Sequence, residues 1–486
     1  MKRNKRVLAI WLAAALGISA LTGCAGGGND SSGASDGNSA GETAETETTA
    51  DTTETTETAD AAQTESADAA AYDDTPYTFK VISENSPDDP TSDVYAIKLA
   101  LDDYKKEHPN FDYEFEVVKK YDIASKIAIL ISSNDVPDLF TYEDGTSLDA
   151  LIERDAIVNI SEDFSRIGVE LEDVVLPGAI SSKHVLSNYE DIYSLPMQLT
   201  TNGVWYNKQM FAEHGWNVPT TWQEFQDLCA DIKEAGIQPL ACNGADKWPI
   251  TRWIMLYADR MEGENVHLDA SQNKNGRSFR DPIFVEAATE AQKMFQNGYF
   301  GEGFNTVEAS TQYQMFLTGQ TAMMYSGSWL LATWTDPEVN TLGEENIGYF
   351  IPPGIEGSQV DMDRASKMDD LSCATALCLG KEKFETGKTH DFLRYLFTTL
   401  GDRQSEVGIM TPYVTTEELE YSPTQQIIVD QLQESLYPTL WFEAKMDSAS
   451  TDVALENAQL LAEGTMTPEE YCERLASSVD ESFPAE

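Results

Sequence analysis

Residues 76 to 145 read PYTFKVISENSPDDPTSDVYAIKLALDDYKKEHPNFDYEFEVVKKYDIASKIAILISSNDVPDLFTYEDG, and this stretch decides the expected fold. It alternates between apolar runs typical of buried strands and apolar side chains at helical spacing. We expect strands at 77–82, 111–117 and 136–142, and helices at 94–104 and 123–130. A strand, helix, strand, helix, strand order predicts an α/β fold with a mostly parallel sheet that is covered on both faces.

Two loops of this stretch are where a ligand is expected. In open parallel sheets, ligands bind beyond the carboxyl ends of the strands. The loops after the first and third expected strands carry the polar candidates Glu84, Asn85, Glu143 and Asp144. Carboxylates accept hydrogen bonds from adjacent hydroxyls, and asparagine both donates and accepts. Solvation at the surface is the alternative for any one acidic residue in so acidic a chain.

The N-terminus has the order of a secretory signal. Basic residues at positions 2, 3, 5 and 6 precede the apolar run 7–20, which is too short to cross a membrane that needs about twenty residues. Residues 21–24, Leu-Thr-Gly-Cys, resemble the bacterial lipobox. We therefore expect a signal peptide at 1–23 and a mature chain whose Cys24 carries lipid that anchors the protein to the outer face of the cell membrane. An ordinary secretory signal that happens to contain a cysteine is the alternative.

The segment after Cys24 has the composition of a tether. Residues 24–75 are rich in Thr, Ser, Ala and acidic residues, and no Lys or Arg occurs between Cys24 and Lys80. Between Asp30 and Asp74 there are 13 acidic residues, which repel one another and keep such a segment extended. We expect a disordered spacer; a binding tail or a glycosylated stalk are the alternatives.

Residues 76–486 have a globular composition, and about 410 residues exceed one hydrophobic core, so two lobes are expected. The net charge of −51 becomes −55 once the four basic signal residues are removed, which argues against nucleic-acid partners. Five cysteines besides Cys24 match no zinc spacing and are expected to be buried, although one disulfide pair stays open: Cys229, Cys242, Cys373, Cys378 and Cys472.

Several further segments, in this order, resemble those of the extracellular solute-binding proteins of ABC transporters, in the family 1 group that includes maltodextrin-binding protein. They are Val136–Phe140, Tyr193–Pro196, Gly203–Lys208, Pro219–Phe225, Phe316–Met324 and Ser326–Trp329. The resemblance implies two α/β lobes joined by crossing strands, a cleft that closes over a carbohydrate, delivery to a membrane permease, and no catalysis or cofactor. We expect an oligosaccharide ligand and a monomeric protein. An equilibrium between open and closed forms would follow if the ligand contacts both lobes.

The same resemblance gives approximate lobe boundaries. It places one crossing strand at 194–204, with Trp205 in hinge packing, and the second crossing between 350 and 370. The first lobe would then comprise about 76–198 and 368–400, and the second about 199–360 and 401–486.

The resemblance also suggests aromatic plates for a sugar ring. Trp329 follows Gly327 where the family places a stacking aromatic, Trp441 matches a later aromatic, and Tyr142 stands at the first-lobe position. A core position is the alternative for Trp329, and for Trp441 the alternative is that the neighbouring Phe442 is the exposed ring.

Three further residues complete the candidates. Asp370 lies on a loop expected to face the cleft, and Trp248 and Arg252 form a cluster in which arginine could bind a sugar or pack a helix. Aromatic and acidic groups favour a neutral sugar over an anionic one.

Two other classes of protein compete with this interpretation. Carboxylates in an aromatic cleft also suit a lipid-anchored glycoside hydrolase, and a surface adhesin would account for the tether. The five histidines are scattered without paired spacing, which argues against a metal hydrolase.

Overall fold

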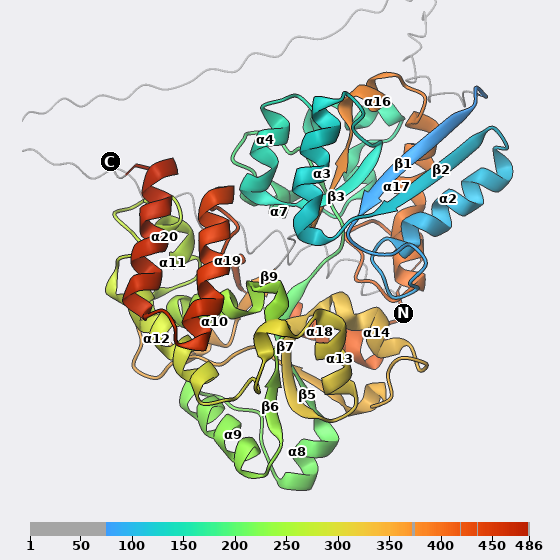
Figure 1. Ribbon diagram of the computed structural model, residues 1–486. Coiled ribbons are helices and arrows are strands. Elements are labelled where there is room, and N and C mark those ends of the chain that lie inside the picture. The colour runs from blue at the N-terminus through green and yellow to red at the C-terminus, as the bar shows by residue number, and fades with distance from the viewer. Residues whose placement is uncertain (1–73, 372–374, 418, 435, 485–486) are drawn as a thin grey trace, which may run out of the picture.

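The computed structural model describes residues 74–371, 375–417, 419–434 and 436–484. The expected signal peptide, Cys24, nearly all of the expected tether and Cys373 lie outside these ranges. Within them, the chain forms two α/β lobes, each built around its own sheet (Figure 1). The predicted α/β class is confirmed. None of the helices in the described ranges combines the length and apolar character needed to cross a membrane.

The first sheet has the strand order β2-β1-β3-β10-β4. Its strands are β1 (Tyr77–Ser83), β2 (Phe111–Val117), β3 (Leu139–Glu143), β4 (Leu195–Pro196) and β10 (Thr375–Leu379). β1 is parallel to both β2 and β3, with Tyr77 opposite Phe111, whereas β10 is antiparallel to its neighbours. The parallel part of this sheet is the part predicted from residues 76 to 145.

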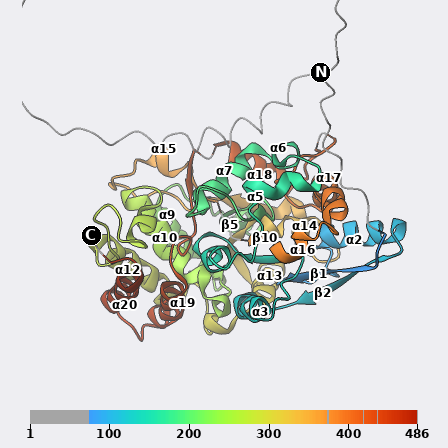
Figure 2. The same ribbon diagram turned by 90° about the horizontal axis from the view of Figure 1, so that it is seen from above.

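Alternation along β1 sends side chains to two different helical layers. Phe79 and Val81 pack toward α2 (Tyr95–Glu107) and α17 (His390–Glu406), and the Phe79 ring meets Phe392 at 4.7 Å. Ile82 packs on the other face, with Ile127 of α3 (Lys120–Ser132). Figures 1 and 2 show α2 and α17 on one side of this sheet and α3 on the other. Smaller helices complete the lobe: α4 (Asp149–Ile152), α5 (Ile160–Asp163), α6 (Leu171–Val174), α7 (Pro177–Leu186) and α16 (Lys381–Glu385).

The second sheet has the order β11-β9-β5-β7-β6, and β8 pairs with β5. Its strands are β5 (Thr201–Asn207), β6 (Gln238–Ala241), β7 (Thr321–Gly327), β8 (Ile347–Phe350), β9 (Met368–Leu371) and β11 (Tyr437–Thr439). The helices of this lobe are α8 (Lys208–His214), α9 (Trp222–Glu234), α10 (Trp248–Glu262), α11 (Val266–Ala270), α12 (Pro282–Gln296), α13 (Ala309–Leu317), α14 (Leu331–Thr335), α15 (Met362–Ala365), α18 (Pro423–Glu434), α19 (Ser448–Glu463) and α20 (Pro468–Ser482). Helix α10 packs against both α12 and α19, and the C-terminal helices α19 and α20 pack against each other and against α12 (Figure 1).

The chain crosses between the lobes at three places, and the second and third of them differ from the expectation. The first crossing, between β4 and β5, falls inside the expected range 194–204. The expected second crossing at 350–370 is wrong, because β9 pairs with β5 and β11 of the second sheet and the chain enters the first sheet only at β10. Strand β9 was missed because its four residues are too few to show the alternation of apolar and polar side chains by which a strand is recognised in a sequence.

The boundary expected near residue 401 also moves toward the C-terminus. Helix α17 continues to Glu406, and the Leu199 amide then donates to Met410 O at 2.9 Å. The Tyr413 hydroxyl donates to Pro196 O at 2.8 Å. The chain therefore leaves the first lobe after Tyr413, and α18 lies against β8 and α14 of the second.

Trp205 lies in β5, on the second-lobe side of the first crossing, and its predicted packing in the hinge stays a prediction. Its side chain is fully buried, its Nε1 donates to Ser326 O at 3.1 Å, and its ring lies 4.8 Å from the ring of Tyr349.

Candidate functional site

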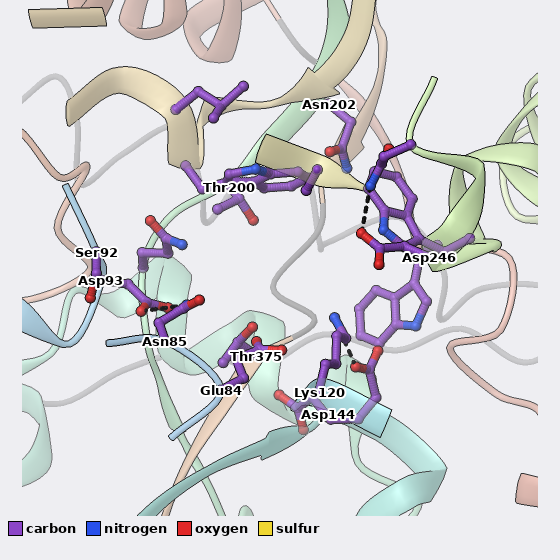
Figure 3. A pocket seen from close by; sticks show the side chains of 18 of the residues that line it. Glu84, Asn85, Ser92, Asp93, Lys120, Asp144, Thr200, Asn202, Asp246 and Thr375 are labelled. Carbon is purple, nitrogen blue, oxygen red and sulfur yellow. Dashed lines mark hydrogen bonds and ion pairs between the residues drawn. The ribbon is translucent and has the colours of Figure 1, made fainter. Parts of the chain in front are cut away.

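A cavity of about 510 Å³ lies between the two lobes. Figure 3 shows Glu84, Asn85 and Lys120 of the first lobe facing Thr200, Asn202 and Asp246 across it. Eight of the ten predicted contact residues line the cavity: Glu84, Asn85, Glu143, Asp144, Trp248, Arg252, Trp329 and Trp441. Tyr142 and Asp370 do not belong to its lining.

The first-lobe wall is formed where β1 and β3 end, as the parallel sheet predicts. The Glu84 amide donates to the Thr141 hydroxyl at 3.3 Å, which holds the two strand ends together. Asn85 donates through Nδ2 to Asp93 at 2.8 Å, and Lys120 forms an ion pair with Glu143 at 3.4 Å.

Asp144 has a more fixed position than its neighbours on this wall. It forms a buried ion pair with Lys183 and accepts from the Gly145 amide at 2.9 Å. Because a buried ion pair is costly to break, Asp144 positions the loop more than it offers a free acceptor.

Tyr142 points away from the cavity, for a reason that lies in strand geometry. Side chains alternate along a strand, so Thr141 and Glu143 share one face of β3 while Tyr142 and Phe140 share the other. The rings of Tyr142 and Phe140 lie 6.1 Å apart within a core cluster of the first lobe, and burial raises the pKa of Tyr142 to about 12. The predicted role of Tyr142 as an aromatic plate is therefore not supported by its place in the fold.

Two tryptophans of the second lobe form an aromatic corner. The rings of Trp248 and Trp329 lie 5.9 Å apart at an interplanar angle of 74°, and both are half-buried. Trp329 Nε1 donates to the Tyr313 hydroxyl at 3.4 Å. A Cβ atom on Gly327 would lie 2.0 Å from the Trp329 ring, so glycine at this position lets the indole lie over the backbone at the end of β7.

Arg252 belongs both to the cavity lining and to a buried charge network. Its Nη1 lies 2.8 Å from Glu443 Oε2, and its Nε lies 3.7 Å from Asp370. The Tyr325 hydroxyl donates to Asp370 at 2.7 Å. Asp370 thus lies behind Arg252 and not in the lining, and desolvation raises the pKa of its carboxyl against the opposing effect of Arg252. The Arg252 guanidinium also lies 5.2 Å from the Trp248 ring, which supports the aromatic corner.

Trp441 lines the cavity although only 2% of its surface is exposed. It packs with Leu186 of the first lobe and with Ala444. Phe442 is fully buried against His267 and Phe279, so the alternative in which Phe442 is the exposed ring is wrong.

Sequence reasoning missed several lining residues: Asp93, Lys120, Asn243, Asp246, Tyr313 and Glu443. Asn243 and Asp246 follow β6, which is parallel to β7, so the rule applied to β1 and β3 would have found them. No local sequence pattern indicates Glu443, because its partner Arg252 lies 191 positions away in the chain.

The described cysteines are buried thiols of low reactivity. Cys229, Cys242, Cys378 and Cys472 are free and buried, and burial raises the pKa of each thiol. They behave as small core side chains.

Known proteins resemble this chain in both sequence and fold. Residues 87–367 match the bacterial extracellular solute-binding protein family. The multiple sugar-binding protein of Streptococcus mutans is 23% identical over 304 residues, covering 60% of this chain and 66% of that protein. The diacetylchitobiose binding protein NgcE of Streptomyces coelicolor is 29% identical over 174 residues, covering 34% of each. Each alignment thus spans less than two thirds of the relative's own length.

Solved structures show the same fold. A structure described as a chitin oligosaccharide binding protein superposes with a TM-score of 0.72 at 18% identity, covering 85% of this chain and 100% of that chain. The family and these relatives are substrate-binding receptors rather than enzymes, so the comparisons support a binding role and not the hydrolase alternative. With more than half of its length matched and both lobes reproduced, this chain belongs to the bacterial extracellular solute-binding protein family.

Proposed function

We propose that this protein is the extracytoplasmic binding component of an ABC transporter, which captures a carbohydrate, most simply an oligosaccharide, and delivers it to the permease. The observation that carries the proposal is the aromatic corner of Trp248 and Trp329 in a cavity lined by carboxylate and amide groups from both lobes. A pyranose presents an apolar C–H face to such rings and hydroxyls to such polar groups. The cavity also falls within the range of about 300–1,000 Å³ usual for small-molecule sites.

The names of the relatives support the same ligand class. Two of them are described as binding multiple sugars and diacetylchitobiose, and a structural neighbour as binding chitin oligosaccharides. None of these ligands transfers to this chain by name, because their alignments are partial or their identity is low.

The N-terminal part of the proposal rests on the sequence alone. We propose that residues 1–23 are removed, that Cys24 carries the lipid, and that residues 24–75 tether a monomeric body to the outer face of the cell membrane. A tether raises the effective concentration of the loaded protein at a membrane partner.

A thermal-shift screen of the purified protein against mono- and oligosaccharides tests the proposed ligand class. A ligand at about a hundred times its dissociation constant adds about 2.7 kcal/mol of stability, which raises the melting temperature by several degrees. Product analysis after incubation separates binding from hydrolysis, since a cleaved oligosaccharide would contradict the receptor role.

A further inference from the structure

The lining of the cavity carries far more negative than positive charge. Eight carboxylates contribute to it but only two cationic side chains, Lys120 and Arg252. Three carboxylates are neutralised in ion pairs, namely Glu143 by Lys120, Glu443 by Arg252, and Asp144 by Lys183. The remaining lining carboxylates include Glu84 and Asp93, whereas Asp246 accepts a hydrogen bond from Asn243 Nδ2 at 2.6 Å.

The excess charge is concentrated in the part of the cavity drawn in Figure 3. Glu84, Asp93 and Asp246 lie around the same space, with Lys120 as the nearby cation. Asp93 is only 7% exposed, and desolvation raises the pKa of all three carboxyls. Asp93 and Asp246 each raise the pKa of Glu84 further, and Lys120 opposes them while it is paired with Glu143.

A second feature of the cavity points to a ligand rich in hydrogen-bond donors. Asn202 and Asn243 are 1% and 2% exposed, and both line the cavity. The Oδ1 atom of each is buried and has no hydrogen-bond partner within the part of the chain that the structure describes. The Thr200 hydroxyl is also buried and has no hydrogen-bond partner within the described residues. Because a buried acceptor without a donor destabilises the protein, a bound molecule that donates to these oxygens would recover that free energy.

The carboxylates are too dispersed to hold a metal ion. Among the described residues, no three acidic, histidine or cysteine side chains come close enough together to form a metal site. An extended organic cation, which presents a charged group and several hydroxyls at once, suits a lining whose carboxylates and amide oxygens come from separate elements.

We propose that the ligand is an amino sugar with a free amino group, whose ammonium pairs with Glu84 while its ring lies against the corner of Trp248 and Trp329. This inference rests on the proposed carbohydrate-binding function and names the class of sugar. The ammonium compensates the charge that Glu84 and Asp93 place in a desolvated site, and the sugar hydroxyls donate to Asn202 and Asn243. Uronic acids and sugar phosphates are repelled by the same carboxylates.

Calorimetric titration of the purified protein with four oligosaccharides of equal length tests this inference. The probes are glucosamine oligomers with free amines, their N-acetylated forms, neutral xylose oligomers and uronic-acid oligomers. We expect the free amine to bind about tenfold tighter or more than the N-acetylated form, because a hydrogen bond to a charged group is stronger than one between neutral groups. Equal or tighter binding of N-acetylated or neutral sugars would overturn the inference and leave the proposed function standing. Binding of none of the four would also overturn the inference, whereas the proposed function fails only if the wider thermal-shift screen finds no sugar.

The variant Glu84→Gln identifies the position of the ammonium. This change keeps the size of the side chain and removes its charge, so we expect affinity for the glucosamine oligomer to fall about tenfold while affinity for a neutral sugar changes little. The exposed Glu302→Gln in the second lobe removes the same charge and serves as the control. An unchanged affinity in Glu84→Gln for the free amine would contradict the assignment.

Discussion

The side-chain nitrogen of Lys445 lies 2.7 Å from the backbone oxygen of Leu186, and these two residues belong to different lobes. The same nitrogen lies 3.2 Å from the oxygens of Ser187 and Asn188, so it caps the C-terminal end of helix α7. Residues 441–446, which we term the clasp, reach from the second lobe to the first. A Cβ atom on Gly145 would lie 2.4 Å from Ala444 O, which shows how closely the clasp approaches the β3 loop.

Replacing Lys445 with methionine should open the two lobes. The substitution keeps much of the length of the side chain but removes all three hydrogen bonds, each worth about 0.5–1.5 kcal/mol or more for a charged donor. We expect a larger radius of gyration by small-angle scattering of the protein without sugar. Lys293→Met is the control, because Lys293 is an exposed residue of α12 that pairs only within its helix, with Glu290. A radius unchanged in Lys445→Met would mean that the clasp does not hold the lobes together.

The clasp should also make closure depend on pH. Burial lowers the pKa of Lys445 from its ordinary 10.5 to about 8. The closed form therefore binds this proton less tightly than an open form with an exposed amine. Closing releases a proton, so raising the pH from about 8 toward 10.5 favours the closed form. We expect the scattering radius to fall over this range in the wild type and to stay flat in Lys445→Met; a radius that grew with pH would show that the linkage has the opposite sign.

The aromatic corner should carry much of the affinity for a sugar. Truncating a central tryptophan typically costs about 2 kcal/mol or more, which is roughly a thirtyfold loss in affinity. We expect losses of this size for Trp329→Ala and Trp248→Ala by isothermal titration. Trp216→Ala is the control, because this half-buried ring stacks on His214 at 4.4 Å and lies outside the cavity lining. A sugar that binds Trp329→Ala as tightly as the wild type would show that the ring is not a plate.

The sequence predicted the fold better than it predicted the site. The helices and strands of residues 77–143 follow periodicities that are visible locally, and the first crossing lies in a segment with a family resemblance. The short strand β9 showed no such pattern, because its place depends on backbone pairing with Asn202 and Thr439. Tyr142 and Glu143 were both proposed for the cavity, yet neighbours on a strand face opposite sides and only Glu143 lines it. Asp370 and Glu443 meet at Arg252 through contacts between distant segments, which no local pattern indicates.

Replacing Cys24 with alanine should release the protein from the membrane without changing its affinity for ligand. The proposed lipid attaches only through this side chain, and two acyl chains are what hold a soluble protein stably at a bilayer. Detergent phase partitioning and metabolic labelling with palmitate measure the anchor, and titration with a bound sugar measures the affinity. Wild-type protein that takes up no label would contradict lipidation, and a variant that loses sugar binding would contradict the separate role of the body.

Arg252 should be the most costly single charge to remove from the second lobe. Its guanidinium is the nearest cation to the buried carboxylates of Glu443 and Asp370, and its side chain is only 5% exposed. Removing one partner of a buried ion pair typically costs about 3–5 kcal/mol, because the other charge remains buried and uncompensated. We expect Arg252→Met to lower the urea midpoint measured by circular dichroism, whereas Arg474→Met, which breaks an exposed pair with Glu470, should change stability by less than about 1 kcal/mol.

The pH dependence of this variant distinguishes buried charge from lost packing. Burial already raises the pKa of Asp370 in the wild type, and the loss of Arg252 removes the main effect that opposes that rise. A carboxyl whose pKa is higher in the folded state contributes stability at low pH that is lost as the pH rises through the folded pKa. The destabilisation of Arg252→Met should therefore be smaller at about pH 5 than at about pH 7.5, and the double variant Arg252→Met/Glu443→Gln should recover part of it at the higher pH. A loss of stability that is the same at both pH values would assign the effect to the packing of the arginine stem instead of its charge.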